Sequence, residues 1–272
     1  MASRTTDTLE RRRLRLLSFN IQTATPTDSY SKYLTQSWRQ LLPNSQRIDN
    51  LDSISTLVSE YDMVALQEVD SGSLRSGFIN QSRYIATHAA HPYWFHQSNR
   101  KVGNMAYPGI GFTGRHSPEK VAEHRLPGAL PGRGALVLEF GGVEGLTIAV
   151  VHLALGPMAR GMQLNYLAEQ LAGRGALIVM GDLNARADSR HVREFRDKLE
   201  LSAPTAELLS YPAWKPRRPL DHILVSRNIR THDAQALEVA YSDHLPVAVT
   251  VDLPVGMLAG EAGPMLALES GV

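Results

Sequence analysis

Short hydrophobic runs separated by polar turns recur along most of the chain, and only two stretches repeat their apolar positions at helical spacing. In residues 48–58 the apolar positions recur every three or four residues, which predicts an amphipathic helix. Residues 158–171 show the same period, with Met162, Leu164 and Leu167 on one side. Helices are therefore expected at only a few of the connections.

The remaining hydrophobic runs are short and rich in Val, Ile, Leu and Ala, which is typical of buried β-strands. They are residues 14–19, 62–69, 110–113, 135–140, 146–152, 176–180, 222–225 and 245–251. Strands outnumber helices, and several strands are adjacent in the sequence. This pattern predicts an α+β fold in layers, with β-sheets packed face to face and helices on the outside.

No internal repeat or linker divides the sequence, so one domain is predicted over residues 14–254. Residues 1–13 are expected to form a basic N-terminal tail. Residues 255–272 are rich in glycine and other small residues and are expected to form a flexible C-terminal tail. The long polar stretch 23–46 is expected to be a surface loop.

Composition and charge narrow the class of protein. The chain has 28 Lys+Arg and 27 Asp+Glu, a net charge of +1, which argues against a protein that coats nucleic acid by charge alone. It has no cysteine, so any metal must be bound by Asp, Glu, Asn or His. No apolar run approaches the roughly 18 residues that a membrane span needs, and the N-terminus lacks the apolar segment of a secretory signal. A cytoplasmic enzyme is expected.

Asn, Glu, Asp and His residues stand at or beside the ends of six predicted strands. One acidic residue at a strand end is usually a turn or cap residue, but six such ends are hard to explain in that way. If these strands belong to one sheet system, their ends place the polar side chains around one cleft. The residues are Asn20, Glu68, His152, Asp182, Asn184, Asp221, His222, Asp243 and His244.

This set of side chains indicates metal-assisted attack of water on phosphorus. Carboxylate oxygens of Glu68, Asp182 and Asp243, with amide oxygens of Asn20 and Asn184, are ligands that suit Mg²⁺ or Mn²⁺. Histidines beside such a site can move protons or stabilise a charged transition state. The sequence contains no glycine-rich phosphate loop, dinucleotide-binding fingerprint or G-x-S-x-G elbow. Nucleotide-driven transfer, hydride transfer and serine esterase chemistry are therefore disfavoured.

Six short motifs follow one another between residues 18 and 247. They are S-F-N (Ser18–Asn20), Q-E-V (Gln67–Val69), H-L (His152 and Leu153), G-D-L-N (Gly181–Asn184), L-D-H-I-L-V-S (Leu220–Ser226) and S-D-H-L-P-V (Ser242–Val247). In content and order they resemble the motifs of the endonuclease/exonuclease/phosphatase (DNase I-like) superfamily. The resemblance implies that family's four-layer α/β sandwich, in which two packed mixed β-sheets are flanked by helices, and it implies a metal-dependent hydrolase of phosphate esters.

The resemblance also implies roles for the metal-binding side chains. Glu68 would be the principal metal carboxylate, Asn20 a nearby ligand or orienting group, and Asp243 would complete the site. The expected cofactor is Mg²⁺ or Mn²⁺. Gln22 stands where several members of the superfamily carry an acid, and no convincing counterpart of the active-site tyrosine of abasic-site endonucleases is found, which disfavours a DNA-repair role.

The catalytic roles implied by the resemblance fall on five further residues. Asp182 would position or deprotonate the attacking water, and Asn184 beside it would hold a phosphate oxygen or a second metal. His152 would donate to the phosphoryl oxygen in the transition state. His244, oriented by Asp221, would form the remaining acid–base pair. The sequence leaves open whether Asp182 or His244 is the working base.

Four residues are candidates for substrate binding. Arg133 precedes a central strand, where it would contact phosphate at the rim of the cleft or simply be a solvated turn residue. Trp214, Arg217 and Arg218 lie in a proline-rich stretch that runs into Asp221. An aromatic ring with several cations suits stacking on a base while gripping phosphates, although the stretch could equally face lipid head groups or keep its charges in water.

The sequence therefore predicts a divalent-metal-dependent phosphoesterase that hydrolyses a phosphodiester or phosphomonoester by water attack. A small or lipid-linked phosphate ester is favoured as the substrate, because it needs only a few cations in the cleft. The alternatives are a Mg²⁺-dependent endo- or exonuclease acting on DNA or RNA, and a non-catalytic binding module of the same fold. A phosphate ester is the expected partner, with nucleic acid or a membrane lipid head group as its alternative sources, and no obligate protein partner is inferred.

Overall fold

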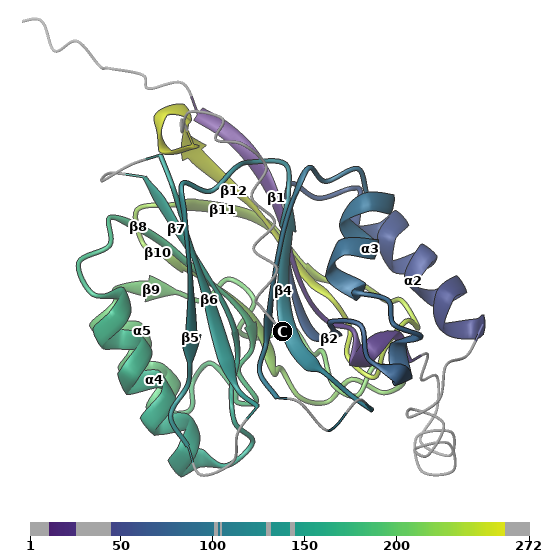
Figure 1. The fold of residues 1–272 in the computed structure, drawn as a ribbon. Helices are drawn as coiled ribbons and strands as arrows, with labels where there is room; N and C mark the ends of the chain where they lie inside the picture. Colours follow the sequence, from purple (N-terminus) through teal and green to yellow (C-terminus); the bar gives the residue numbers. More distant parts are fainter. Residues whose placement is uncertain are drawn as a thin grey trace, which may run out of the picture.

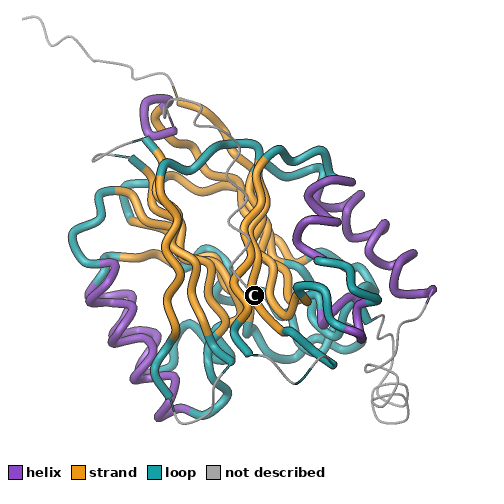
Figure 2. Tube along the Cα trace, viewed as in Figure 1, coloured by secondary structure: helices purple, strands orange, loops and turns teal. Residues whose placement is uncertain are grey.

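The computed structural model describes residues 11–25, 45–100, 103, 105–128, 132–141 and 145–258. Two six-stranded mixed β-sheets pack face to face, with helices on their outer sides (Figures 1 and 2). The predicted layered α+β architecture is confirmed. Residues 1–10 and 259–272 of the expected tails, and most of the polar stretch 23–46, lie outside the described residues.

The first sheet has the strand order β11-β12-β1-β2-β4-β3. Its strands are β1 (Arg11–Asn20), β2 (Met63–Asp70), β3 (Tyr93–Ser98), β4 (Pro108–Gly114), β11 (Arg230–Ala236) and β12 (Val247–Pro254). The second sheet has the order β5-β6-β7-β8-β10-β9. Its strands are β5 (Lys120–Arg125), β6 (Gly134–Phe140), β7 (Leu146–His152), β8 (Ala176–Asp182), β9 (Leu201–Ser202) and β10 (Asp221–Ser226).

The helices cover the outer face of each sheet. Beside the first sheet lie α2 (Ser45–Val58) and α3 (Gln81–His88), and beside the second lie α4 (Pro157–Leu171) and α5 (Arg190–Lys198) (Figure 1). Three short 3₁₀ turns, η1 (Gln22–Ala24), η3 (Leu74–Ser76) and η4 (Val255–Leu258), complete the described elements. None of the described helices is long and apolar enough to cross a membrane.

The central strands are apolar on both faces because each sheet is covered on both sides. In β1, Leu14 and Leu16 pack between the two sheets, whereas Leu17 and Phe19 pack beneath the helices of the first sheet. Successive side chains of a strand point to opposite faces, so a continuous apolar run is what such a strand requires. The same alternation in β7 places Ile148 between the sheets.

Two boundaries and the burial of Met162 differ from the sequence prediction. The first strand begins at Arg11 rather than at Leu14, because Arg11–Arg13 pair with the end of β12 and Arg13 forms an ion pair with Asp252. These three residues therefore belong to the domain and not to a tail. At the other end, Val255–Leu258 of the expected C-terminal tail form η4, and Met257 and Leu258 pack against the core. In α4, Leu164 and Leu167 are buried as predicted, but Met162 is 51% exposed, so the apolar side of this helix is narrower than its sequence indicated.

Strand direction brings the predicted polar residues to one edge of the sandwich. β1 and β2 are parallel, as are β7 and β8, so the carboxyl ends of each pair lie together. β10 is antiparallel to β8 and β12 is antiparallel to β1, so the beginnings of these two strands lie at the same edge. Asn20 of the first sheet donates a hydrogen bond to Asp182 of the second (3.2 Å). The site is therefore assembled from both sheets.

The turn after β2 is organised around one buried carboxylate. Asp70, which is fully buried, accepts hydrogen bonds from the backbone N–H groups of Ser73 and Tyr107, and from the side chains of Ser76 and Arg75. Burial alone would raise the pKa of Asp70, but these donors outweigh it and lower the pKa to about 2. The carboxylate consequently fixes the turn that carries Arg75.

We expect Asp70→Asn to lower the free energy of unfolding at pH 7 and to lose part of this effect in acid. The stabilisation by the carboxylate is complete above its ordinary pKa of 3.8 and is lost as the pH falls through the folded-state value of about 2. That difference corresponds to about 2 kcal/mol at pH 7, and the gap between wild type and variant should narrow by about 1 kcal/mol by pH 3. Urea unfolding at both pH values measures the gap. The exposed Asp49→Asn serves as the control, and a pH-independent gap for Asp70→Asn would contradict the assignment.

Candidate active site

Three buried side chains form the centre of the site. One ligand atom each from Asp182, Asp221 and His244 lies within 4.8 Å of the other two. Asp182 and Asp221 are direct partners in the register of β8 and β10, and His244 precedes β12 in the neighbouring sheet. Gly181 allows the close approach of β8 to β7, since a Cβ atom there would lie 1.9 Å from the carbonyl oxygen of Val151. The centre thus depends on tight packing of strand ends.

Glu68 reaches the site because β2 carries a bulge. The register of β2 against β4 shifts between Gln67 and Val69, and Glu68 between them has a left-handed backbone (φ +56°). A bulge of this kind turns the side chain away from the regular alternation. The Glu68 side chain remains 40% exposed, whereas Asp182 is almost fully buried. Glu68 is therefore the carboxylate that faces the cleft.

Asn20 ties two carboxylates together. Its Nδ2 donates to Glu68 Oε1 and to Asp182 Oδ2, both at 3.2 Å. Its Oδ1 accepts a hydrogen bond from the backbone N–H of Gln22. In this arrangement Asn20 orients Glu68 and Asp182, which is one of the two roles that the sequence resemblance implied for it.

His244 and Asp221 form a hydrogen-bonded dyad. His244 Nδ1 lies 2.7 Å from Asp221 Oδ2, and the ring of Tyr211 packs against the imidazole with 4.8 Å between ring centroids. Burial lowers the pKa of His244, but the charge and hydrogen bond of Asp221, together with Asp182 and Asp243, raise it to about 10. The imidazole is therefore held in its protonated form at neutral pH.

The carboxyl groups of the site repel one another. Burial and the charge of Asp221 raise the pKa of Asp182 to about 7, although His244 acts in the opposite direction. Burial and the charge of Glu68 raise the pKa of Asp243 to about 6, although His244 again acts in the opposite direction. The second oxygen of Asp221 is buried and has no hydrogen-bond partner among the described residues. A divalent cation would relieve this repulsion, so the residues fit one.

His152 lies between the carboxylates and an arginine. Its Nε2 is 3.6 Å from Asp182 Oδ2 and 3.9 Å from Glu68 Oε1, and it is also hydrogen-bonded to the guanidinium of Arg133. Burial, followed by the charges of Arg133 and His244, lowers the pKa of His152 well below its ordinary value. His152 is consequently neutral, and its Nε2 accepts a hydrogen bond from Arg133.

Asn184 is fixed by its backbone and side chain. Its N–H donates to Asp182 Oδ1 (2.8 Å), its Nδ2 donates to the carbonyl of Leu153 (2.9 Å), and its backbone is left-handed (φ +50°). Arg160 donates to the carbonyl oxygen of Asn184. These bonds orient Asp182. By contrast, His222 points away from the site and lies fully buried beside the carbonyl of Ala185.

An active-site cleft of about 510 Å³ adjoins this centre. Glu68, His152 and Arg133 line it, and the contact of Arg133 with phosphate stays a prediction. Trp214 instead lines a separate groove with Val239. The full lining of the active-site cleft is Glu68, Arg75, Asn99, Arg100, Pro108, Gly109, Gly128, Gly132, Arg133, His152, Ala154, Leu155, Gly156, Ala159 and Gln163.

The structure therefore separates the four candidates for substrate binding. Arg133 belongs to the cleft, whereas Trp214, Arg217 and Arg218 are not among the described residues that line it. The exposed side chains of Arg217 and Arg218 lie on the loop whose Tyr211 packs on His244. Among the polar residues of the cleft, the sequence does not predict Arg75, Asn99 or Arg100, because nothing in their spacing distinguishes them from surface loop residues.

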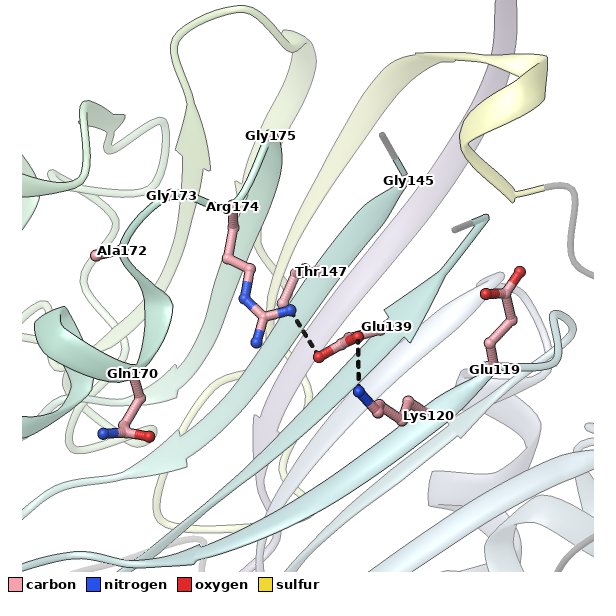
Figure 3. Close-up of a pocket in the computed structure, with 10 residues that line it drawn as sticks. All are labelled: Glu119, Lys120, Glu139, Gly145, Thr147, Gln170, Ala172, Gly173, Arg174 and Gly175. Atoms are coloured by element: carbon pink, nitrogen blue, oxygen red, sulfur yellow. Dashed lines mark hydrogen bonds and ion pairs between the residues drawn. The ribbon is translucent and has the colours of Figure 1, made fainter. Parts of the chain in front are cut away.

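A second hollow, of about 650 Å³, lies at the opposite end of the second sheet. Figure 3 shows that Arg174 and Lys120 are both directed at Glu139, at 2.6 Å and 4.0 Å. Both cations of this hollow are thus paired with Glu139. It contains none of the side chains gathered at the catalytic centre.

Comparisons with known proteins were consistent with this geometry. A model of the endonuclease/exonuclease/phosphatase family matches residues 17–244. No curated protein matches the sequence. Among solved structures, the chain is similar to an endonuclease/exonuclease/phosphatase family protein from Leptotrichia buccalis (13% identity, TM-score 0.66, covering 88% of this chain and 100% of that chain).

Two further structural neighbours have individual names. One is a mannosyl-6-phosphatase from Bacteroides thetaiotaomicron (16% identity, TM-score 0.63, covering 88% of this chain and 99% of that chain). The other is the human Nocturnin catalytic domain with a bound sulfate anion (19% identity, TM-score 0.62, covering 88% and 93%). At such low identity these likenesses show the fold, and the predicted four-layer DNase I-like sandwich is confirmed.

Proposed function

The chain belongs to the endonuclease/exonuclease/phosphatase family, whose members are hydrolases, and on that premise we propose that it is a divalent-metal-dependent phosphoesterase. It would hydrolyse a phosphodiester or phosphomonoester by attack of water. The observation that carries the proposal is the cluster of Asp182, Asp221 and His244 beside a cleft lined by Glu68 and by arginines. Asp243 lies close enough for the charges of His244 and Glu68 to shift its pKa. A binding module without catalysis would have no use for so many mutually repelling carboxyl groups.

Glu68 and Asp243 would hold the metal, with Asn20 orienting Glu68. Mg²⁺ or Mn²⁺ suits these oxygen ligands. When bound, such an ion neutralises charge on a phosphate oxygen and so stabilises the transition state. Asn20 keeps the Glu68 carboxylate aimed at the cleft through its 3.2 Å hydrogen bond.

Asp182 is the better candidate for the base and His244 for the cationic partner. The Nδ1 atom of His244 is engaged by Asp221, which stabilises the protonated imidazole, so His244 can donate from Nε2 but is a poor acceptor. The hydrogen-bond donors to Asp182 are both neutral, namely the amide of Asn20 and the backbone N–H of Asn184. Its carboxylate is therefore not committed to a hydrogen bond with a cation. Asp182 would take the proton of the attacking water. The resemblance implied that His152 would donate to the phosphoryl oxygen, but its Nε2 accepts a hydrogen bond from Arg133. Arg133 would therefore take over that donation.

The cleft favours a small or lipid-linked phosphate ester over a long nucleic acid. A nuclease needs a broad basic surface along the strand backbone, and a net charge of +1, in which 27 acidic residues balance 28 basic ones, does not indicate one. The cleft of about 510 Å³ is of the size that takes small ligands. The second candidate, a nuclease, is favoured only by the exposed Arg217 and Arg218 on the loop beside His244.

A panel of substrates with metal and chelator controls tests the proposal. We expect turnover of bis-p-nitrophenyl phosphate, p-nitrophenyl phosphate, inositol phosphates or sphingomyelin that EDTA abolishes and Mg²⁺ or Mn²⁺ restores. Asp182→Ala should lose this turnover, whereas the exposed Asp188→Asn should keep it. Cleavage of supercoiled or single-stranded DNA with these substrates untouched would instead identify a nuclease. Turnover that EDTA does not affect would contradict the metal requirement.

A further inference from the structure

We propose that Arg75 and Arg100 form a second anion-binding subsite in the active-site cleft, which binds a phosphate group of the substrate other than the one that is hydrolysed. The inference rests on the proposed phosphoesterase function, because it concerns how that substrate is recognised. It narrows the substrate to a phosphate ester that carries a second phosphate group.

The charge of the cleft is the first observation. Three arginines line it, Arg75, Arg100 and Arg133, and Glu68 is the one acidic residue among the described residues that line it. Like charges facing a shared cleft repel one another, and that repulsion is relieved when an anion binds. Since Glu68 is expected to bind the metal, the cleft as a whole is left strongly cationic.

The arginines belong to different parts of the cleft. Arg133 contacts His152 at the catalytic centre, where it serves the phosphate that is hydrolysed. Arg75 lies in the turn after β2, and Arg100 follows β3, so both come from the first sheet. Neither is linked by a hydrogen bond or ion pair to a catalytic residue in the described part of the chain. Their position suits an anion that is bound beside the reacting group and not an oxygen of the reacting group itself.

Arg75 is held in place before any ligand arrives. Its Nε lies 2.8 Å from Asp70 Oδ2, and its side chain is 16% exposed while Asp70 is completely buried. A guanidinium has five N–H groups, and this ion pair occupies one of them. Because Asp70 also accepts from Ser73, Ser76 and Tyr107, its charge is spread over several donors. Arg75 therefore keeps donors for an anion in the cleft, at little cost in side-chain entropy.

Arg100 approaches the same cleft across a glycine. A Cβ atom on Gly132 would lie 3.6 Å from both Cβ and Cδ of Arg100, so the aliphatic part of this side chain rests against the Gly132 backbone. Gly132 directly precedes Arg133. Arg100 is exposed and has no ion-pair partner among the described residues. The lining of the cleft also includes apolar side chains, Pro108 and Leu155 among them, which suit the part of the substrate that joins the two phosphates.

Binding of hydrolysis-resistant phosphonates tests the subsite without turnover. Isothermal titration of the full chain in metal-free buffer would compare propylphosphonate with α,ω-alkane bisphosphonates of increasing chain length. We expect the best bisphosphonate to bind at least about tenfold more tightly than propylphosphonate, as a charge-assisted contact to a second phosphate group predicts. No gain at any chain length would overturn the proposal.

Matched variants assign the gain to these residues. Arg100→Ala and Arg75→Ala should each remove most of the tenfold gain, whereas Arg83→Ala, which removes an exposed arginine of α3 outside the cleft, should preserve it. Arg75→Ala removes the ion-pair partner of buried Asp70 and so also affects the fold around it. Arg100→Ala, at an exposed position, tests the subsite without disturbing that ion pair. Retention of the full gain in both cleft variants would refute the assignment even if the enzyme hydrolyses phosphate esters.

Competition then identifies where the second phosphate comes from. Thymidine oligonucleotides with one to four phosphates are added against the best bisphosphonate. Competition that strengthens with each added nucleotide shows that the second phosphate is the next one along a strand. Competition that stops improving at two phosphates shows that it belongs to a small bisphosphorylated ester. Both results support the subsite, whereas absence of competition by any two-phosphate ligand contradicts it. If the protein shows no EDTA-sensitive turnover but the binding gain is present, the proposed function is contradicted and the subsite is not.

Discussion

Asp182→Asn should lower kcat by about three orders of magnitude while leaving substrate binding nearly unchanged. The substitution preserves the shape of the side chain but removes the proton acceptor, and general-base catalysis by a placed side chain contributes about 10²- to 10⁴-fold. Asp182 is almost completely buried and receives the backbone N–H of Asn184 at 2.8 Å. The asparagine keeps an oxygen that can accept this bond, so the fold is expected to be retained. Steady-state kinetics on the best ester substrate measure kcat and KM separately.

The partner variant and the control make this prediction specific. His244→Ala should lower kcat to a similar extent, because it removes the cation that Asp221 holds at 2.7 Å. Asp188→Asn, at an exposed position, should change neither constant. Full activity in both Asp182→Asn and His244→Ala, with turnover still sensitive to EDTA, would mean that the site residues are assigned wrongly although the family is right.

The convergence of the catalytic residues could be predicted from the sequence because it depends on the ends of buried strands. Long apolar runs mark these strands clearly, and polar residues at their ends stand out against them. The structure brings Asn20, Asp182 and Asp221 to one edge, as expected. These residues come from two different sheets, however. The order of the strands within each sheet could not be predicted, because no sequence pattern indicates it.

Elements with weak hydrophobic patterns were not predicted. β5 and β11 are edge strands whose side chains are mostly exposed, so their sequences, Lys120–Arg125 and Arg230–Ala236, lack an apolar run. They are strands because β6 and β12 provide hydrogen-bond partners for their backbones. The short helices α3 and α5 were missed for a related reason, since each buries only a few residues against its sheet.

The roles of single loop residues were the least predictable part of the site. Arg133 and Arg75 both line the cleft. Arg133 differs from other arginines of the sequence only in preceding a central strand, and Arg75 only in its ion pair with Asp70, which the folded structure brings about. Trp214 looked like a substrate contact because it precedes Asp221 in a basic stretch, but its ring lines a different groove. The same loop contributes Tyr211 to the site, through a ring contact with His244 that no sequence pattern indicates.

Glu68→Gln should raise the Mg²⁺ or Mn²⁺ concentration needed for half-maximal activity by at least about tenfold. Loss of a residue that only orients a metal ligand typically lowers metal affinity about 10- to 100-fold, and loss of a carboxylate ligand itself should lower it at least as much. Glu68 is the most exposed carboxylate of the centre and receives Asn20 Nδ2 at 3.2 Å, a bond that the glutamine oxygen can still accept. The fold should therefore persist. Titration of activity with metal measures the change, and Glu60→Gln, an exposed surface position, is the matched control.

Metal binding can be measured in the same variants without turnover, which separates a ligand from a residue that merely supports the substrate. An ion that binds only the folded chain raises its unfolding temperature, and the increase grows with the logarithm of its affinity. Mn²⁺ should thus stabilise the wild type and Glu60→Gln, and stabilise Glu68→Gln far less. An equal shift in all three proteins, together with a higher KM in Glu68→Gln, would place Glu68 against the substrate. The metal would then have to be held by Asp243 and the buried pair of Asp182 and Asp221.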